Sequence, residues 1–357
     1  MSRQAASGGD VFGSNFLLTT KAESNIKSEE ELLKGGFMKR LFILGLMVML
    51  IFVASSVGAQ KTLRLSIATG GTGGVYYPMG GGMANIISKY IPYTEATAEV
   101  TTASVDNCLL VGQGKADLAL IMADTGWDAY QAKARFKDKI PLRTLAVLYP
   151  NNMHIVTVEG KGIEKVADLK GKRVSTGAPG SGTEVMALRV VEAYGLDPTK
   201  DMTRDKLSVS ESAGALKDRK IDAFFWVGGL PTAAIMDLGA TPGIKIKLIG
   251  HADAVPKMRE TYGPIYVKGI IPAKTYPGQA VDVPIAVVWN LLVCHENMKE
   301  NVAYDIVKTI FDHKPELITV HSEARQITLE PQAAGGSPIP FHPGAIRYFT
   351  EKGLKIK

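Results

Sequence analysis

Cysteine and histidine, on which much metal and redox chemistry depends, are scarce in this sequence. Two cysteines, Cys108 and Cys294, and six histidines occur among 357 residues, and none of them lies at a spacing typical of a metal site. Both cysteines lie in apolar segments, DNCLLVG and LLVCHEN, which favours two separate buried thiols over a disulfide. We therefore expect no metal site, and the pairing of the cysteines stays open.

The chain also lacks a tract of lysine or arginine. It carries 41 basic and 35 acidic residues, a formal net charge of +6. A weak positive charge without such a tract gives no sign of a nucleic-acid partner, and it would not repel small anions.

Nucleotide-binding and catalytic motifs are missing as well. The segments GTGGVY and GSGTEV come nearest to G-x-G-x-x-G, but Tyr76 and Val185 stand where the third glycine should be, and no G-K-[ST] follows either segment. Ser181 lies in PGSGT rather than in the G-x-S-x-G of a nucleophile elbow. No set of residues indicates an enzyme or a cofactor, and we expect neither.

The apolar run at residues 41–53 is too short to span a bilayer comfortably. It follows a basic segment that begins at Met38, and the small residues Val57 and Ala59 come after it. This order is the pattern of a secretory signal peptide, predicted at 38–59 with cleavage near Ala59. A retained membrane anchor is the alternative.

Residues 1–37 are polar, show no apolar periodicity and precede a methionine suited to initiation, so we interpret them as a mis-called N-terminal extension. The mature chain then covers 60–357, or 298 residues. Removing six basic and five acidic residues leaves 35 and 30, a net charge of +5. The residue directly after the cleavage site is Gln60 and not a cysteine, so the new N-terminus offers no cysteine for a lipid anchor. We therefore expect a soluble, periplasmic product.

Short apolar runs alternate with helical patterns along the mature chain, which predicts an α/β fold with parallel strands. The alternation occurs twice, and each time a glycine-rich loop follows the first strand. We expect strands at 63–68, 96–101, within 114–123, at 173–176, 207–210 and within 219–227, and helices at 76–90, 105–114, 184–194 and 211–218.

Two further extended stretches connect the repeats. Residues 142–160 contain two strand runs broken at 150–152, and residues 281–294 form an uninterrupted run. If both cross between lobes, lobe 1 consists of 60–149 and 281–357, and lobe 2 of 150–280. Paired crossings of this kind allow two lobes to close around a ligand.

The first glycine loop, in IATGGTGGVYYP, follows a strand and precedes a helix. Glycines let several backbone N–H groups point to one place, and the helix adds its positive N-terminal end, so the loop is suited to an anion. The second loop, GAPGSGT, likewise places glycines between a strand and a helix, and it adds two hydroxyl groups. Glycines that only permit tight strand-to-helix packing are the alternative explanation.

Four segments occur together and in order: IATGGTGGVYYP, DLKGKRVSTGAPGSGTE, KIDAFF with PTAAI, and PIPFHPGAIRYF. With them the chain closely resembles the TAXI family of solute receptors for TRAP transporters, over essentially the whole mature chain. The resemblance implies a type II periplasmic binding-protein fold, two parallel-sheet lobes joined by two hinge crossovers. It also implies a small organic anion or amino acid as ligand, with glutamate, glutamine and dicarboxylates such as 2-oxoglutarate first, and delivery to an ion-gradient-driven membrane permease.

Carried over to matching positions, the resemblance implies ligand contacts in both glycine loops and in the segments after them. These residues are Thr69, Gly71, Thr72, Gly73, Gly74, Tyr76, Tyr77, Ser104, Asn107, Ser181, Gly182, Thr183 and Trp226.

Several of these roles stay open. One of Tyr76 and Tyr77 is expected to form a wall of the pocket, and for the other a place in the pocket and a place in the core both stay open. Ser104 is suited to cap a helix, to contact the ligand, or to do both. Asp124 is expected to be the N-cap of its helix.

Three more residues have two interpretations or depart from the family. Met122 stands where the resemblance leads us to expect glutamine, which changes a polar ligand contact into an apolar one. Trp226 fits either stacking on the ligand or filling the core. His154 fits a satisfied hinge histidine better than a cleft residue.

Two classes of function follow. The first is a monomeric transport receptor that binds without chemistry, with a TRAP permease as its partner. The second is an exported enzyme or a sensory ectodomain on the same fold.

The predicted processing gives the first test. N-terminal sequencing and peptide mapping of the expressed precursor should find no peptide from residues 1–37, and the exported protein should begin at Gln60. Peptides from residues 1–37 in the precursor would show that the extension is translated.

Overall fold

The computed structural model describes residues 35–36, 38–41, 44 and 61–356. By its contacts the chain divides into two units, Met1–Lys61 and Thr62–Lys357. The described residues of the first unit, 35–36, 38–41 and 44, are helical. Most of the predicted extension and signal peptide, and the cleavage site near Ala59, lie outside the described residues. No helix among those described is both long and apolar enough to cross a membrane.

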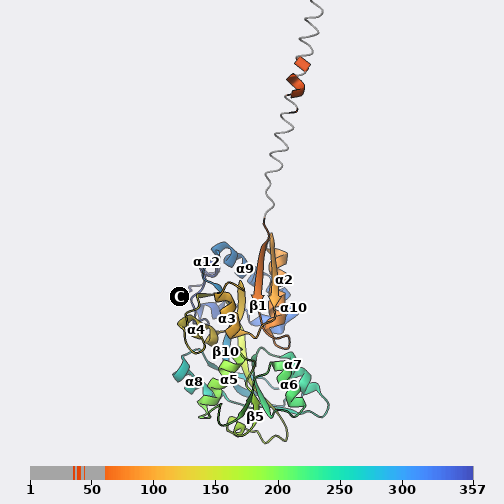
Figure 1. Cartoon of the computed structure of the whole chain (residues 1–357), viewed down its shortest axis with the longest axis vertical. Coiled ribbons are helices and arrows are strands. Elements are labelled where there is room, and N and C mark those ends of the chain that lie inside the picture. Colours follow the sequence, from red (N-terminus) through yellow and green to blue (C-terminus); the bar gives the residue numbers. More distant parts are fainter. Residues whose placement is uncertain (1–34, 37, 42–43, 45–60, 357) are drawn as a thin grey trace, which may run out of the picture. The chain divides into compact units, whose positions relative to one another are not determined.

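The second unit is built on a sheet of ten strands (Figure 1). The strands are β1 Leu63–Ala68, β2 Thr94–Glu99, β3 Leu118–Met122, β4 Leu142–Val158, β5 Arg173–Ser175, β6 Thr203–Asp205, β7 Ala223–Gly228, β8 Ile246–Leu248, β9 Val267–Ile271 and β10 Val283–His295. Their order is β2-β1-β3-β10-β4-β7-β5-β6, and β8 pairs with β4 while β9 pairs with β10.

Helices connect the strands and cover the sheet. The α-helices are α2 Tyr76–Tyr90, α3 Ser104–Gly112, α4 Ala123–Gln131, α5 Gly182–Ala193, α6 Val209–Lys217, α7 Ala233–Ala240, α8 Val255–Tyr262, α9 Glu300–Asp312, α10 Lys314–Val320, α11 Glu330–Ala333 and α12 Pro343–Glu351. Short 3₁₀ helices are η1 Val166–Leu169, η2 Ala252–Ala254 and η3 Ser322–Gln326.

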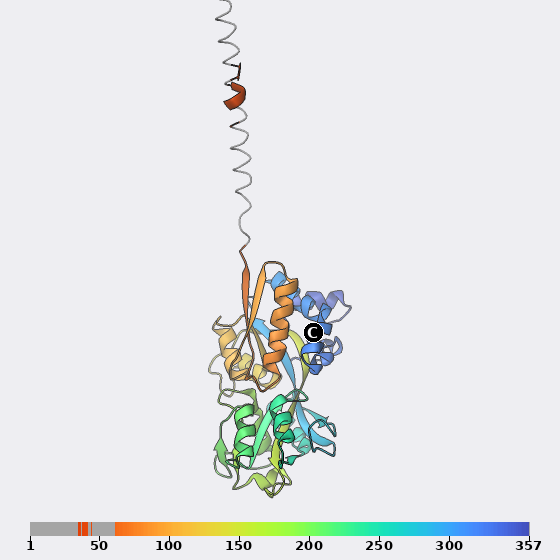
Figure 2. The same ribbon diagram turned by 90° about the vertical axis from the view of Figure 1, so that its right-hand side faces the viewer.

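The two ends of the sheet repeat one topology. Strands β2, β1 and β3 are parallel to their neighbours and are followed in the sheet by antiparallel β10. Strands β6, β5 and β7 are parallel in the same way and are followed by antiparallel β4. Figure 2 shows the two halves, one orange and yellow with the blue C-terminal helices, the other mostly green. This repeated order confirms the predicted α/β fold of the type II periplasmic binding-protein kind.

Strands β4 and β10 belong to both halves. They pair with each other over most of their lengths, and each also pairs with strands of the repeats. The predicted lobe boundary at 149/150 falls inside β4, and the one at 280/281 falls shortly before β10. The division into lobes itself stays a prediction.

The predicted break at residues 150–152 is wrong, because β4 is one strand of 17 residues. Pro150 pairs with Trp289, and the register of the pair shifts directly after it, where Leu148 and Tyr149 of β4 lie opposite Asn290 of β10. Proline has no N–H to donate to a ladder, and a bulge beside it is a place where a sheet tolerates it.

The predicted strand at 207–210 is also wrong, since β6 ends at Asp205 and α6 begins at Val209. The Ser208 Oγ accepts the Glu211 N–H, and a Glu211 carboxylate oxygen accepts the Ser208 N–H. This is a capping box, and the S-x-x-E spacing that announces it is present in the sequence.

The two cysteines are confirmed as free thiols, and both side chains are buried. Cys108 lies in α3, Cys294 lies near the end of β10, and burial raises the pKa of each thiol. Since only the exposed thiolate reacts readily, neither residue should be modified in the folded protein.

A thiol-specific chromogenic reagent should therefore label neither cysteine in the native protein at pH 8 and both after unfolding in guanidinium chloride. Reduction before unfolding should leave the result unchanged. Two thiols that appear only after reduction would show that a disulfide forms instead.

Candidate functional site

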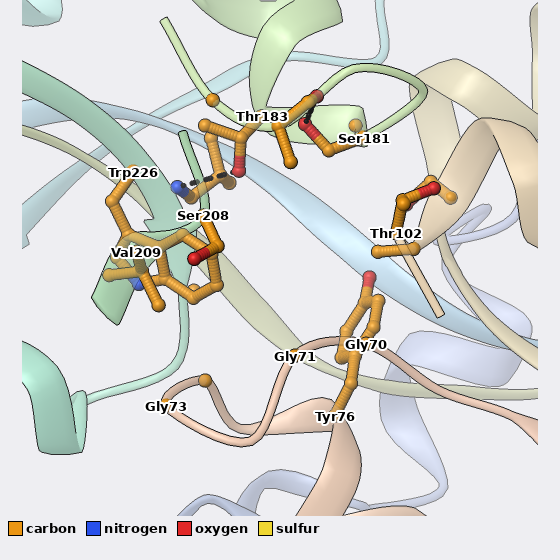
Figure 3. Close-up of a pocket in the computed structure, with 18 of the residues that line it drawn as sticks. Gly70, Gly71, Gly73, Tyr76, Thr102, Ser181, Thr183, Ser208, Val209 and Trp226 are labelled. Atoms are coloured by element: carbon orange, nitrogen blue, oxygen red, sulfur yellow. Dashed lines mark hydrogen bonds between the residues drawn. The ribbon is translucent and has the colours of Figure 1, made fainter. Parts of the chain in front are cut away.

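A cavity of about 470 Å³ lies where loops from the two halves meet. Its walls come from the loops that follow β1, β2, β5 and β6 and from the ends of β3 and β7. Figure 3 shows residues of the first glycine loop facing Ser181, Thr183, Ser208 and Trp226 of the other half. Ligands of open α/β sheets bind at the carboxyl ends of the strands, which is where this cavity lies.

Four helices, α2, α3, α5 and α6, begin at the cavity wall. Ser181 caps α5 by accepting the Glu184 N–H at 3.1 Å, and Ser208 caps α6. Two N–H groups in the first turn of α3, those of Val105 and Asp106, donate to the Gly180 carbonyl of the other half at 3.1 and 3.4 Å. Three of the four positive helix ends are thus engaged by the protein itself.

Helix α2 differs from these three. Val75, the residue before it, provides no side-chain acceptor, so among the described residues no side chain caps its first turn. The preceding loop turns through a hydrogen bond from the Gly74 N–H to the Gly71 carbonyl at 3.1 Å. The N-terminus of α2 and the glycine loop therefore form the part of the wall best suited to an anion.

Glycines on each side of the cavity let the halves approach closely. A Cβ atom on Gly73 would lie 2.0 Å from the Ser210 Oγ, and one on Gly182 would lie 2.5 Å from the Met122 Sδ. The Gly73 carbonyl also accepts the Ala234 N–H at 3.4 Å. A larger residue at Gly73 would therefore press against α6, and one at Gly182 against the end of β3, in each case an element of the other half.

Of the two neighbouring tyrosines, Tyr76 lies at the cavity and Tyr77 lies outside it with 37% of its surface exposed. The Tyr76 hydroxyl donates to the Asn290 Oδ1 and accepts a hydrogen bond from the Asn151 Nδ2 at 3.5 Å. Burial raises the pKa of the Tyr76 hydroxyl. The two hydrogen bonds hold the ring in place as part of the cavity wall.

Two of the predicted contacts, Thr69 and Asn107, lie behind the cavity wall. The Thr69 Oγ1 donates to the Glu99 carbonyl at 2.5 Å, and the Asn107 Nδ2 donates to the Thr69 and Leu120 carbonyls at 2.7 and 2.8 Å. Both residues are buried. They hold the ends of β1, β2 and β3 together and so position the loops.

Of the roles left open for Ser104, capping is wrong, and the N-cap role predicted for Asp124 is wrong as well. Ser104 is the first residue of α3 rather than its cap, and its Oγ accepts the Met122 N–H at 3.0 Å while the residue lines the cavity. Asp124 lies inside α4, where it accepts hydrogen bonds from the Thr125 N–H and the Tyr266 hydroxyl, each at 2.7 Å.

Trp226 and His154, the two aromatic candidates near the lobe junction, differ in whether they line the cavity. Trp226 lines the cavity, and its indole N–H donates to the Thr232 Oγ1 at 2.8 Å, which fixes the ring. His154 is buried away from the cavity, with its ring nitrogens 2.9 Å from the Asn152 carbonyl oxygen and 2.8 Å from the Tyr276 hydroxyl. Burial lowers the pKa of His154 to about 4, so this histidine is neutral.

The remaining predicted residues, Gly71, Thr72, Gly73, Gly74, Ser181, Gly182 and Thr183, all line the cavity. The Thr183 Oγ1 accepts the Val227 N–H at 3.3 Å, so its hydroxyl also braces the wall.

Sequence reasoning missed one whole side of the cavity, residues 206–211. It missed them because the predicted strand at 207–210 hid a loop, and the S-x-x-E spacing of Ser208 and Glu211 is the signal that would have revealed it. Val100 and Thr101 also line the cavity, and they were missed because the predicted strand at 96–101 contained them, whereas β2 ends at Glu99.

The chemistry of the wall suits binding by hydroxyl and backbone groups. The lining contains no histidine, cysteine or aspartate, and its charged side chains are Lys206 and Glu211. Among the described residues, no group of three histidine, cysteine or carboxylate side chains is placed to hold a metal ion.

The close approach at Gly73 gives a test of this geometry. Gly73→Val should leave the protein folded but abolish ligand-induced stabilisation, because the side chain would meet Ser210 and Ala234 and hold the loops apart. Gly81→Ala is the matched control, since a Cβ there meets nothing within 4 Å and alanine favours a helix. Circular dichroism and thermal-shift titration with carboxylates measure both effects, and unchanged binding by Gly73→Val would remove this loop from the site.

Solved structures with similar folds include periplasmic binding proteins. The periplasmic aliphatic sulphonate binding protein SsuA from Escherichia coli is 16% identical, with 82% of this chain and 84% of that one covered and a TM-score of 0.46. A putative L-cystine ABC transporter from Listeria monocytogenes is 14% identical, with 74% and 96% covered and a TM-score of 0.45. A binding protein component of an ABC phosphonate transporter from Pseudomonas aeruginosa is 12% identical, with 75% and 81% covered and a TM-score of 0.47.

A family model gives the assignment. The model of the NMT1-like family matches residues 67–353, which include both glycine loops, the two strands shared by the halves and the C-terminal helices α9 to α12. The chain therefore belongs to the NMT1-like family.

Proposed function

We propose that the protein is an extracytoplasmic solute receptor that binds a small organic anion between its two halves. The observation that carries the proposal is the first glycine loop, with the N-terminus of α2 behind it, facing a cavity that loops of the other half enclose. A volume of about 470 Å³ is in the range of small-molecule sites. Backbone N–H groups at a helix N-terminus attract a carboxylate without a charged side chain.

The resemblance to the TAXI family supports a more specific version. In it, the ligand is a small organic anion or an amino acid, with glutamate, glutamine and 2-oxoglutarate first, and the receptor delivers it to a TRAP permease driven by an ion gradient. A cleaved signal peptide at 38–59 exports the protein to the periplasm, where it acts as a monomer.

Closure is part of the proposal. Lobe 1, residues 60–149 and 281–357, and lobe 2, residues 150–280, rotate about β4 and β10, the strands that both halves share. Contacts between the halves, such as the hydrogen bonds to the Gly180 carbonyl, then belong to the closed form. Ligand binding favours that form because only there do both glycine loops reach the same molecule.

A thermal-shift screen of residues 60–357 tests the proposal. The panel contains glutamate, glutamine, 2-oxoglutarate, succinate, other amino acids and several sugars. A ligand at about 100 times its dissociation constant adds roughly 2.7 kcal/mol, which raises the midpoint by several degrees in a protein of this size.

A shift confined to one or a few carboxylates or amino acids is the expected result. Shifts with sugars alone would contradict the anion site. Recovery of the ligand by mass spectrometry separates a receptor from an enzyme, because a receptor returns its ligand unchanged.

A further inference from the structure

One lysine, Lys206, lines the cavity on the side opposite the first glycine loop, and the binding role of the glycine loops does not involve it. We propose that Lys206 binds the second carboxylate of a dicarboxylate ligand, so that the site selects a carboxylate over the matching amide. The inference rests on the proposed function and adds to it the residue that sets specificity for charge.

Lys206 lies in the loop between β6 and α6 and lines the cavity. Its side chain is 48% exposed, and its Nζ lies 3.3 Å from the Glu184 Oε1. Part of the Lys206 side chain therefore lies at the cavity, and its ammonium group makes one ion pair.

Glu184 does not need Lys206 to be neutralised. Its carboxylate is completely buried, and the Arg204 Nη2 lies 3.1 Å from the same oxygen that Lys206 approaches. The Arg135 Nη2 lies 2.8 Å from the other oxygen. Three cations around one carboxylate leave a local excess of two positive charges, and Lys206 makes the longest of the three contacts.

An excess of positive charge at a cavity wall attracts an anion. Arg204 is largely buried beside Glu184, with 16% of its side chain exposed, and it does not line the cavity. Lysine has a flexible stem and a compact charge, so Lys206 can turn from Glu184 toward a ligand while the two arginines keep Glu184 paired.

The other charged side chain of the lining does not oppose this assignment. Glu211 accepts the Ser208 N–H at 2.8 Å, and that hydrogen bond lowers the pKa of its carboxyl group. Its negative charge is thus directed at the start of its own helix, where the positive helix end compensates it.

The two anion-binding parts come from different halves of the protein. The N-terminus of α2 and the first glycine loop belong to one half, and Lys206 belongs to the other. A ligand with a carboxylate at each end would contact both anion-binding parts. A ligand with one carboxylate would leave the excess positive charge around Glu184 without a counter-charge.

The test compares matched ligands on matched variants. The ligand pairs are glutamate and glutamine, aspartate and asparagine, and succinate and succinamate, which differ in charge at one end and little in size. The variants are Lys206→Met, which removes the charge and keeps much of the stem, Lys206→Arg, which keeps the charge, and Lys200→Met, which removes an exposed lysine paired with Asp197. Isothermal titration calorimetry at low and moderate salt gives the dissociation constants.

In the wild type, at least one dicarboxylate should bind more tightly than its amide. Lys206→Met should weaken that dicarboxylate about tenfold or more, as expected for loss of a charge-assisted hydrogen bond, and change amide binding less than about twofold. The salt dependence of dicarboxylate binding should fall with it. Lys206→Arg should keep the preference, and Lys200→Met should behave as the wild type.

Three outcomes overturn the inference. If the wild type prefers the amides, or if Lys206→Met weakens both members of a pair equally, Lys206 does not select charge, while the receptor proposal stands. If Lys206→Met lowers the melting temperature of the unliganded protein and weakens every ligand, its role is structural. If no anion in the panel binds the wild type, the receptor proposal fails and the inference fails with it.

Discussion

The pairing of β4 with β10 is the constraint on which the rest of the structure depends. The two antiparallel strands run through both halves, and every other strand of the sheet is placed by pairing to them directly or through a neighbour. Because β4 passes through the junction without a break, the loops of the two halves meet at one fixed place. The cavity lies there, with Asn151 of β4 in its wall.

An irregularity in this pairing links the junction to the cavity. The register shift between Trp289 and Leu291 surrounds Asn290, a buried residue whose Nδ2 donates to the Tyr149 carbonyl at 3.2 Å. The Asn290 Oδ1 accepts the Tyr76 hydroxyl, and Tyr76 starts the helix behind the first glycine loop. The residue at the register shift, Asn290, thus positions the Tyr76 ring in the cavity wall. A movement of β4 against β10 would therefore shift that ring.

The electrostatics of the site depend on which of the four helix N-termini at the cavity are capped by other groups of the protein. Serine side chains cap α5 and α6, and a carbonyl from the other half occupies the start of α3. The start of α2 has no side-chain cap, and the cations around Glu184 outnumber its charge. These two places lie in opposite halves, so in the proposed function one ligand has to reach both, which would link its binding to the approach of the halves.

Local features of the sequence were enough to predict a large part of this architecture. The bounds predicted for the first strand and the helix after the glycine loop agree with β1 and α2, because apolar alternation and a glycine-rich turn are local signals. The strand predicted at 207–210 is wrong because its apolar and polar residues alternate as in a strand, whereas Ser208 and Glu211 form a capping box that starts a helix. The repeated order of elements sufficed to predict the fold class.

Roles that depend on distant partners were decided by the tertiary structure alone. Ser104 and Asp124 look like helix caps in the sequence, but their side chains meet Met122 and Tyr266, residues that no local pattern connects to them. The difference between Tyr76 and Tyr77 depends on Asn290, and the cation excess at Glu184 depends on Arg135 in the other half. The sequence by itself determined the α/β repeat, the glycine loops and the buried thiols, because neighbouring residues produce those features. Only the folded chain decided which side chains face the cavity, because that depends on contacts between residues far apart in the sequence.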